Sequence, residues 1–260
     1  MKPGMSKYIV FALLFSLANL GRGNQLENKQ GIIQATDLEG LPEPVKRFMA
    51  YSQVVGTPFV QKARIKQRGR FKMAADKPWT PFIAEQEYDI STASFVWKVD
   101  LKMAPLIHIT GTDRLENGVG NMRINLFGFI PLVNAKGSEL DQGSMTRYLS
   151  ETIWFPQSFL DPHITWEAID SLSAKGILTI NDKSVEGIFQ FDEKGRFTKF
   201  TCERYYISGD EKLLLPWSTP IYGYGKRQGL QLATEGKAIW DHPDGEFTYI
   251  DVEITDVEYE

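Results

Sequence analysis

Hydrophobic positions recur with a period of two along most of the chain after residue 60. The alternation is clearest at Phe82, Ala84, Gln86, Tyr88 and Ile90, and again at Val185, Gly187, Phe189 and Phe191. This period is typical of strands in a half-buried sheet. Turn sequences such as Glu116-Asn-Gly and His242-Pro-Asp-Gly separate the runs at short intervals. We therefore expect a mainly β protein, with about ten strands in a curled antiparallel sheet that forms a half-barrel or open barrel.

Two segments carry a helical period instead. Val45, Phe48, Met49 and Ser52 share one face of an N-terminal helix that begins after Leu41 and ends before Gly56. Asp141 can cap a second helix from about Gln142 to Phe155, which Pro156 ends. An apolar stripe runs along this helix and comprises Met145, Tyr148, Leu149, Thr152 and Ile153. We expect the second helix to cross the concave face of the sheet and close it.

The first residues follow a different pattern from the rest. Lys2 and Lys7 precede an uncharged apolar stretch from Tyr8 to Leu20, which is the pattern of a secretory signal. The stretch is shorter than the roughly 20 apolar residues of a membrane span. We predict a signal peptide at residues 1–23 or, as the second choice, an N-terminal anchor that would hold the protein on a membrane. A linker at 24–40 and a single β-rich domain at 41–260 follow, so the protein is expected to be exported to the periplasm or cell envelope.

Composition excludes several classes of function. The 29 Lys and Arg and the 33 Asp and Glu are interspersed, so no basic surface for nucleic acid is predicted. The single Cys202 forms no intramolecular disulfide, and the three histidines are too scattered for a metal motif. No nucleophile elbow, phosphate loop or dinucleotide fingerprint is present, so we predict no cofactor and no metal. A site assembled from carboxylates on distant strands stays open.

The most informative constellation lies on the second helix. Arg147, Glu151 and Trp154 are spaced i, i+4, i+7 on the face opposite the apolar stripe. Arg before Glu is the weaker order for such a pair, and Glu near a helix C-terminus is unfavourable, so helix stability does not explain the choice. The pair either faces a ligand pocket or forms a salt bridge that ties the helix to neighbouring strands. Asp113 falls on the inner face of its strand, as a site residue or as a partner for Arg147 or Arg70.

Six tryptophans would suit either the wall of an apolar cavity or an ordinary β core. Trp97 lies in an alternating run and is expected to line the core or a cavity. Trp217 follows Pro216 and is expected to anchor a loop.

Several segments together resemble an uncharacterised bacterial family defined as a domain of unknown function, number 6544. They span most of the chain from residue 41 onward and comprise Leu41-Pro-Glu-Pro-Val-Lys-Arg-Phe, Trp79-Thr-Pro-Phe-Ile-Ala-Glu-Gln, Phe95-Val-Trp97, Asp113-Arg-Leu-Glu-Asn-Gly-Val-Gly, Arg147-Tyr-Leu-Ser-Glu151-Thr-Ile-Trp154-Phe-Pro and Pro216-Trp217. The resemblance implies a fold and no activity. The expected architecture is also similar to the half-barrels of periplasmic lipoprotein carriers and lipid-binding proteins, an analogy that does not fix function.

Three functional hypotheses follow. In the first, the half-barrel binds an apolar or amphipathic small molecule or lipid; Arg147 and Glu151 orient its polar head, and Trp97 and Trp154 line the apolar part. The second is a cell-envelope hydrolase that uses carboxylates such as Asp113 and Glu151. The third is a protein-interaction module with a filled core, which would present an exposed apolar patch. The sequence defines neither the ligand nor the oligomeric state.

Overall fold

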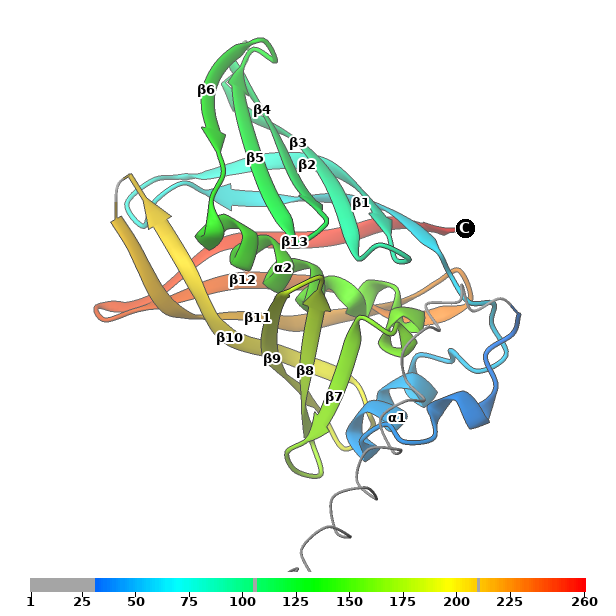
Figure 1. The fold of residues 1–260 in the computed structure, drawn as a ribbon. Helices are drawn as coiled ribbons and strands as arrows, with labels where there is room; N and C mark the ends of the chain where they lie inside the picture. Colours follow the sequence, from blue (N-terminus) through cyan, green and yellow to red (C-terminus); the bar gives the residue numbers. More distant parts are fainter. Residues whose placement is uncertain (1–30, 105–106, 210) are drawn as a thin grey trace, which may run out of the picture.

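The computed structural model describes residues 31–104, 107–209 and 211–260, and most of these residues belong to one curved sheet (Figure 1). Its elements, in chain order, are η1 (Ala35–Leu38), α1 (Glu43–Tyr51), β1 (Lys62–Lys72), β2 (Trp79–Asp89), β3 (Ser94–Ala104), β4 (Ile107–Glu116), β5 (Val119–Leu126), β6 (Ile130–Ala135), α2 (Ser138–Glu151), η2 (Thr152–Trp154), η3 (Pro156–Leu160), β7 (Ile164–Ala168), β8 (Ser173–Ile180), β9 (Lys183–Phe191), β10 (Phe197–Ser208), β11 (Glu211–Arg227), β12 (Leu230–His242) and β13 (Gly245–Tyr259).

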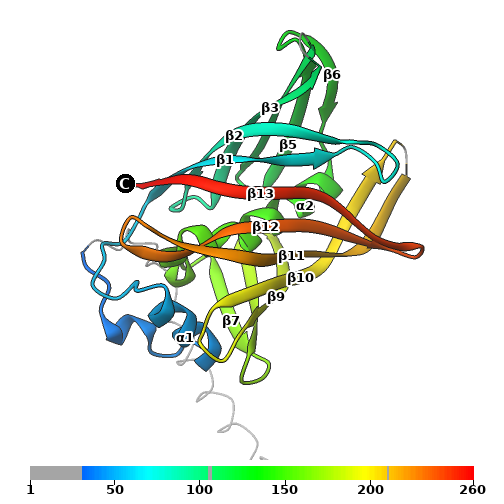
Figure 2. The same cartoon turned by 180° about the vertical axis from the view of Figure 1, so that it is seen from behind.

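The sheet holds 13 strands in the order β6-β5-β4-β3-β2-β1-β13-β12-β11-β10-β9-β8-β7. All described pairings are antiparallel, and every neighbouring pair except β1 and β13 is consecutive in the sequence. The predicted turns connect hairpins; at β4–β5, for example, Asn117 and Gly118 both take the positive φ that a tight hairpin needs. Figure 2 shows the convex side, with β1, β13 and β12 in the middle of the sheet. The expected mainly β half-barrel is confirmed.

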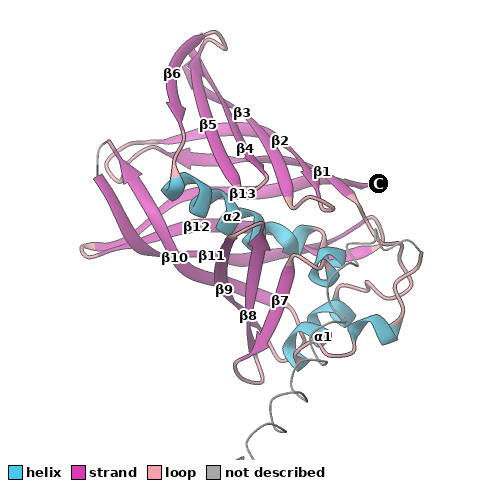
Figure 3. Ribbon diagram, in the orientation of Figure 1, coloured by secondary structure: helices cyan, strands magenta, loops and turns pink. Residues whose placement is uncertain are grey.

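Helix α2 lies across the concave face, as Figures 1 and 3 show. It connects the two edge strands β6 and β7, so it occupies the opening that the curled sheet leaves. The helix begins at Ser138 rather than near Gln142, and Asp141 is not its cap. The Asp141 carboxylate instead accepts hydrogen bonds from the backbone N of Gly120 (2.8 Å) and from Nζ of Lys183 (2.7 Å). It therefore joins the helix to β5 and β9.

The N-terminal part of the described chain packs beside one end of the half-barrel. Helix α1 buries Val45, Phe48 and Met49, the face expected from the sequence. Residues 31–40, placed in a linker by the sequence analysis, include η1 and the fully buried Ile33, whose backbone N donates to Thr57 O. The predicted signal peptide or anchor at 1–23, and residues 24–30 of the linker, lie outside the described residues.

Aromatic side chains fill the half-barrel at the α1 end. Phe159 of η3 packs on Phe48 of α1 and on Phe189 of β9, and Phe189 also contacts Phe197 and Phe200 of β10. All five side chains are buried. None of these five side chains lines the cavity that the concave face encloses with α2.

Candidate functional site

A cavity of about 460 Å³ lies between the concave face and α2. Most of its wall is apolar, and the apolar members include Phe71, Phe82, Val99, Leu101, Ile109, Met122, Ile124, Ile153, Phe247, Ile250 and Val252. They come from β1 to β5 and from β13, with Ile153 from η2, because alternate residues of each strand point inward. The cavity is therefore built by the inner faces of many hairpins at once.

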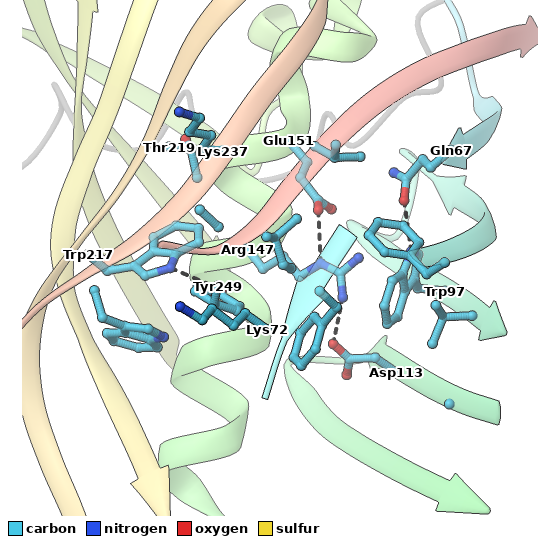
Figure 4. A pocket seen from close by; sticks show the side chains of 18 of the residues that line it. Gln67, Lys72, Trp97, Asp113, Arg147, Glu151, Trp217, Thr219, Lys237 and Tyr249 are labelled. Atoms are coloured by element: carbon cyan, nitrogen blue, oxygen red, sulfur yellow. Dashed lines mark hydrogen bonds and ion pairs between the residues drawn. The ribbon is translucent and has the colours of Figure 1, made fainter. Parts of the chain in front are cut away.

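Arg147 is the centre of the polar part of this wall (Figure 4). Its Nε donates to Glu151 Oε1 at 2.9 Å, one turn along α2. Its Nη1 donates to Asp113 Oδ2 on β4 at 2.8 Å, and its Nη2 donates to Gln86 Oε1 on β2 at 2.9 Å. The three charged side chains are only 12–15% exposed. The guanidinium thus ties α2 to two strands of the sheet.

A second layer of hydrogen bonds holds the carboxylate of Glu151. Its Oε2 accepts from Gln86 Nε2 at 2.8 Å and from the Tyr88 hydroxyl at 2.9 Å. Trp97 contributes in another way, because its ring lies 4.6 Å from the Arg147 guanidinium carbon, within cation–π distance. Both oxygens of Glu151 are therefore occupied by protein donors.

Electrostatics favour a permanently charged Arg147. Burial opposes the cation, but the nearby carboxylates of Glu151 and Asp113 outweigh that cost and raise the Arg147 pKa above its ordinary value. Burial, reinforced by the negative charge of Glu151, raises the Tyr88 pKa well above its usual range, so the tyrosine stays a hydrogen-bond donor. Arg147 and its two carboxylate partners therefore form an ion-pair network.

The Arg147 and Glu151 pair has features of both interpretations drawn from the sequence. The pair is a structural salt bridge that also forms part of a cavity wall, and Asp113 is the partner of Arg147. The remaining oxygen of Asp113, Oδ1, is enclosed without a hydrogen-bond partner among the described residues. Both oxygens of Glu151 thus accept hydrogen bonds from the protein, and the unpartnered oxygen of Asp113 is shielded from solvent.

All five predicted site residues lie on the wall of the same cavity: Trp97, Asp113, Arg147, Glu151 and Trp154. Trp154 reaches it from the 3-10 turn η2, after α2 has ended, and is 7% exposed. Their roles toward a ligand stay predictions.

Sequence reasoning missed an aromatic group on the other side of the cavity. Trp217 is not in a loop but in β11, where it pairs with Trp240 of β12, and both line the cavity. Arg204 of β10 lies beside both rings, with its guanidinium carbon 4.7 Å from the Trp217 ring and 5.4 Å from the Trp240 ring. The signal was the alternation Phe200, Cys202, which places Arg204 on the inner face.

Exposed apolar side chains occur at one end of the sheet, and two of them line the cavity. Met73 and Ile207, which belong to its wall, are 45% and 44% exposed. The hairpins β1–β2, β3–β4, β5–β6 and β10–β11 all turn at this end of the sheet. Their exposed apolar residues are Met73, Met103, Ile107, Phe127, Phe129, Ile130, Ile207, Leu213 and Leu214. We call this group the apolar rim.

Two absences hold for the part of the chain that the structure describes. No group of three or more His, Cys, Asp and Glu side chains is arranged to hold a metal ion there. None of the described helices has the length and apolar character needed to cross a bilayer.

Comparisons with known proteins give a family and distant structural similarities. The model of a family of unknown function, DUF6544, matches residues 31–252. No curated protein matches the chain.

Several solved structures are similar to the chain at low sequence identity, and three of them are as follows. A domain described as an outer membrane lipoprotein-sorting protein from Vibrio parahaemolyticus is 11% identical over 76% of this chain and 85% of its own, with a TM-score of 0.43. A DUF1329 family protein from Desulfovibrio piger is 9% identical over 85% and 94%, with a TM-score of 0.45. A LolA superfamily protein from Nitrosomonas europaea is 13% identical over 84% and 92%, with a TM-score of 0.43.

Proposed function

Because the chain belongs to the DUF6544 family, whose function is unknown, we propose its function from the cavity itself: the protein binds an apolar or amphipathic small molecule, such as a lipid, between its curved sheet and α2. The observation that carries this proposal is the cavity of about 460 Å³, which lies within the size range of small-molecule sites. Its wall is largely apolar with a few polar side chains, the usual composition of such sites.

Transfer of apolar surface from water into this cavity supplies the binding energy. Burial stabilises a ligand by roughly 25 cal/mol for each Å² of apolar surface that leaves water. The rings of Trp97, Trp154, Trp217 and Trp240 offer wide, rigid contact surfaces that lose little conformational freedom on binding. Arg147 joins α2 to β2 and β4 through its hydrogen bonds, so we assign to this network the role of holding α2 over the ligand.

The apolar rim supports uptake of the ligand at this end of the half-barrel. An apolar molecule that leaves a lipid surface would meet Met73 and Ile207 before it reached the interior wall. The interaction-module hypothesis also expects an exposed apolar patch, but it requires a filled core, and the described residues enclose a cavity. The proposed setting is the periplasm or cell envelope, which the pattern of residues 1–23 supports.

Native mass spectrometry tests the proposal directly. The protein is purified without detergent from cells that express the full chain, and its mass is compared before and after extraction with organic solvent. We expect a stoichiometric apolar or amphipathic ligand, identified in the extract. A protein that carries nothing and takes up no lipid offered in vesicles would contradict the proposal.

A matched pair of variants links the ligand to this cavity. Ile124 of β5 lies on the cavity wall, so Ile124→Trp should fill part of the space and reduce bound ligand at least tenfold, a change of about 1.4 kcal/mol. Ile83 of β2 is 67% exposed, and Ile83→Trp should leave the bound ligand unchanged. Equal loss of ligand in both variants would place the binding site elsewhere.

A further inference from the structure

Arg204 carries a positive charge on the cavity wall that no described carboxylate neutralises. Its Nε donates to the backbone O of Gly143 on α2 at 3.1 Å, and its Nη1 donates to the hydroxyl of Tyr249 at 3.3 Å. Trp217 donates its indole N–H to the same hydroxyl at 3.1 Å. These partners are neutral, and among the described residues Arg204 forms no ion pair and its Nη2 has no hydrogen bond.

Arg147, the other arginine on this wall, differs in charge balance. It binds two carboxylates, and each of its three nitrogens donates to a neighbouring side chain. The second oxygen of Glu151 accepts hydrogen bonds from Gln86 and Tyr88, and the second oxygen of Asp113 is buried. Arg204 is therefore the arginine of this wall whose charge is free for a ligand. Lys72 and Lys237, which also line the cavity, add positive charges without a described ion-pair partner.

We propose that the cavity ligand is an anion, with a carboxylate or phosphate head on an apolar chain, and that Arg204 binds this head. The inference rests on the proposed function and defines its ligand class. An arginine fork matches carboxylate and phosphate oxygens. The hydrogen bonds to Gly143 and Tyr249 and the contacts with the Trp217 and Trp240 rings hold this guanidinium in place. Attraction to an anion is stronger here than in water because the surrounding wall is largely apolar.

A series of ligands with the same hexadecyl chain tests the charge requirement. Dissociation constants of hexadecanoate, hexadecyl phosphate and 1-hexadecanol are measured with the protein purified from cells that express the full chain, after extraction of any resident ligand. We expect at least one anion to bind roughly tenfold to a hundredfold more tightly than the alcohol, as for hydrogen bonds to charged groups. A preference for hexadecanoate would indicate a fatty acid, and a preference for the phosphate would indicate a phospholipid-like head. Equal affinity for all three would overturn this inference and leave the proposed function standing, whereas no binding would count against both.

Variants of Arg204 assign the effect to this side chain. Arg204→Gln should lower the affinity for the preferred anion to that for the alcohol, and Arg204→Lys should restore part of the difference. Arg68→Gln is the control, because Arg68 lies on the outer face, pairs with Glu253 and is 63% exposed. If Arg204→Gln does not fold, the comparison of ligands on the unmodified protein still decides the question. Unchanged discrimination in a folded Arg204→Gln variant would exclude Arg204 as the head-group site.

Discussion

At the scale of single residues, the position of Arg147 shows how one side chain can both hold two elements together and line a cavity. It was recognised in the sequence because its order relative to Glu151 is unfavourable for an isolated helix. In the structure, hydrogen bonds from Arg147 to Asp113 and Gln86 compensate for this unfavourable order. Both partners lie on strands far from Arg147 in the sequence. Spacing along one helix contains no information about such partners, so their distances could not be predicted. The inward parity of Asp113 nevertheless identified one of them as a candidate.

Replacement of Arg147 should be strongly destabilising. Arg147→Ala leaves two buried carboxylates without their cation, which costs about 3–5 kcal/mol of folding free energy. Urea denaturation of the variant and the original protein measures this difference. Arg64→Ala is the matched control, because Arg64 is 46% exposed and pairs with surface carboxylates, for which about 1 kcal/mol or less is expected. Equal stability of the Arg147 variant would show that the network is not needed to hold α2.

At the scale of elements, the sequence was most informative where structure is set by neighbouring residues. Strands β2, β3 and β9 and their turns follow from alternation and turn chemistry, both of which are local. Trp217 was misplaced because Pro216 suggested a loop. The proline is tolerated because the described pairing between β11 and β12 begins only at Trp217, so Pro216 needs to pair with β10 alone. Which residues of β10, β11 and β12 pair is set by the assembled sheet, so the local sequence around Pro216 does not contain this information.

The docking of α2 on β5 depends on a glycine. A Cβ atom at Gly120 would lie 2.7 Å from the backbone O of Leu140 and 2.7 Å from Ser144 Oγ, closer than real contacts allow. Gly120→Ala should therefore push α2 away from β5 and weaken the hydrogen bond to Asp141, with a loss of about 1–3 kcal/mol. Thermal unfolding measures the change. Val119→Ala is the control at the adjacent exposed position, and it should be nearly neutral. A Gly120→Ala variant as stable as this control would mean that the helix has room to move.

At the scale of the whole molecule, the end of the half-barrel beside α1 is filled by phenylalanine side chains, none of which lines the cavity. Trp154, Trp217 and Trp240 belong to the buried core and also to the cavity wall. Hydrophobic residues of both kinds alternate in the same way along their strands. The sequence therefore predicted a curved sheet with a crossing helix, but not which end is filled, because that depends on where η3 and α1 pack.

The rim should control how fast a ligand enters. Phe129 is 75% exposed at the β5–β6 turn, and Phe129→Ser removes apolar surface there without touching the cavity wall. We expect slower uptake of lipid from vesicles, by roughly tenfold, with an unchanged amount bound at equilibrium. Stopped-flow fluorescence with labelled lipid separates the two quantities. The same rate in Phe129→Ser and the original protein would exclude this turn from the uptake route.

The pairing of β1 with β13 has a consequence for how the chain folds. Strands β1 to β6 form one half of the sheet and β7 to β12 the other, and β13 is the strand through which the two halves join. Residues such as Ala63 and Tyr259 must meet across nearly the whole described chain, so this step carries a large loop-closure entropy and belongs to the slow, non-local class of folding events. Each half can pair its own hairpins earlier, but neither encloses the cavity alone. A chain still under synthesis therefore cannot enclose the cavity until β13 has been made.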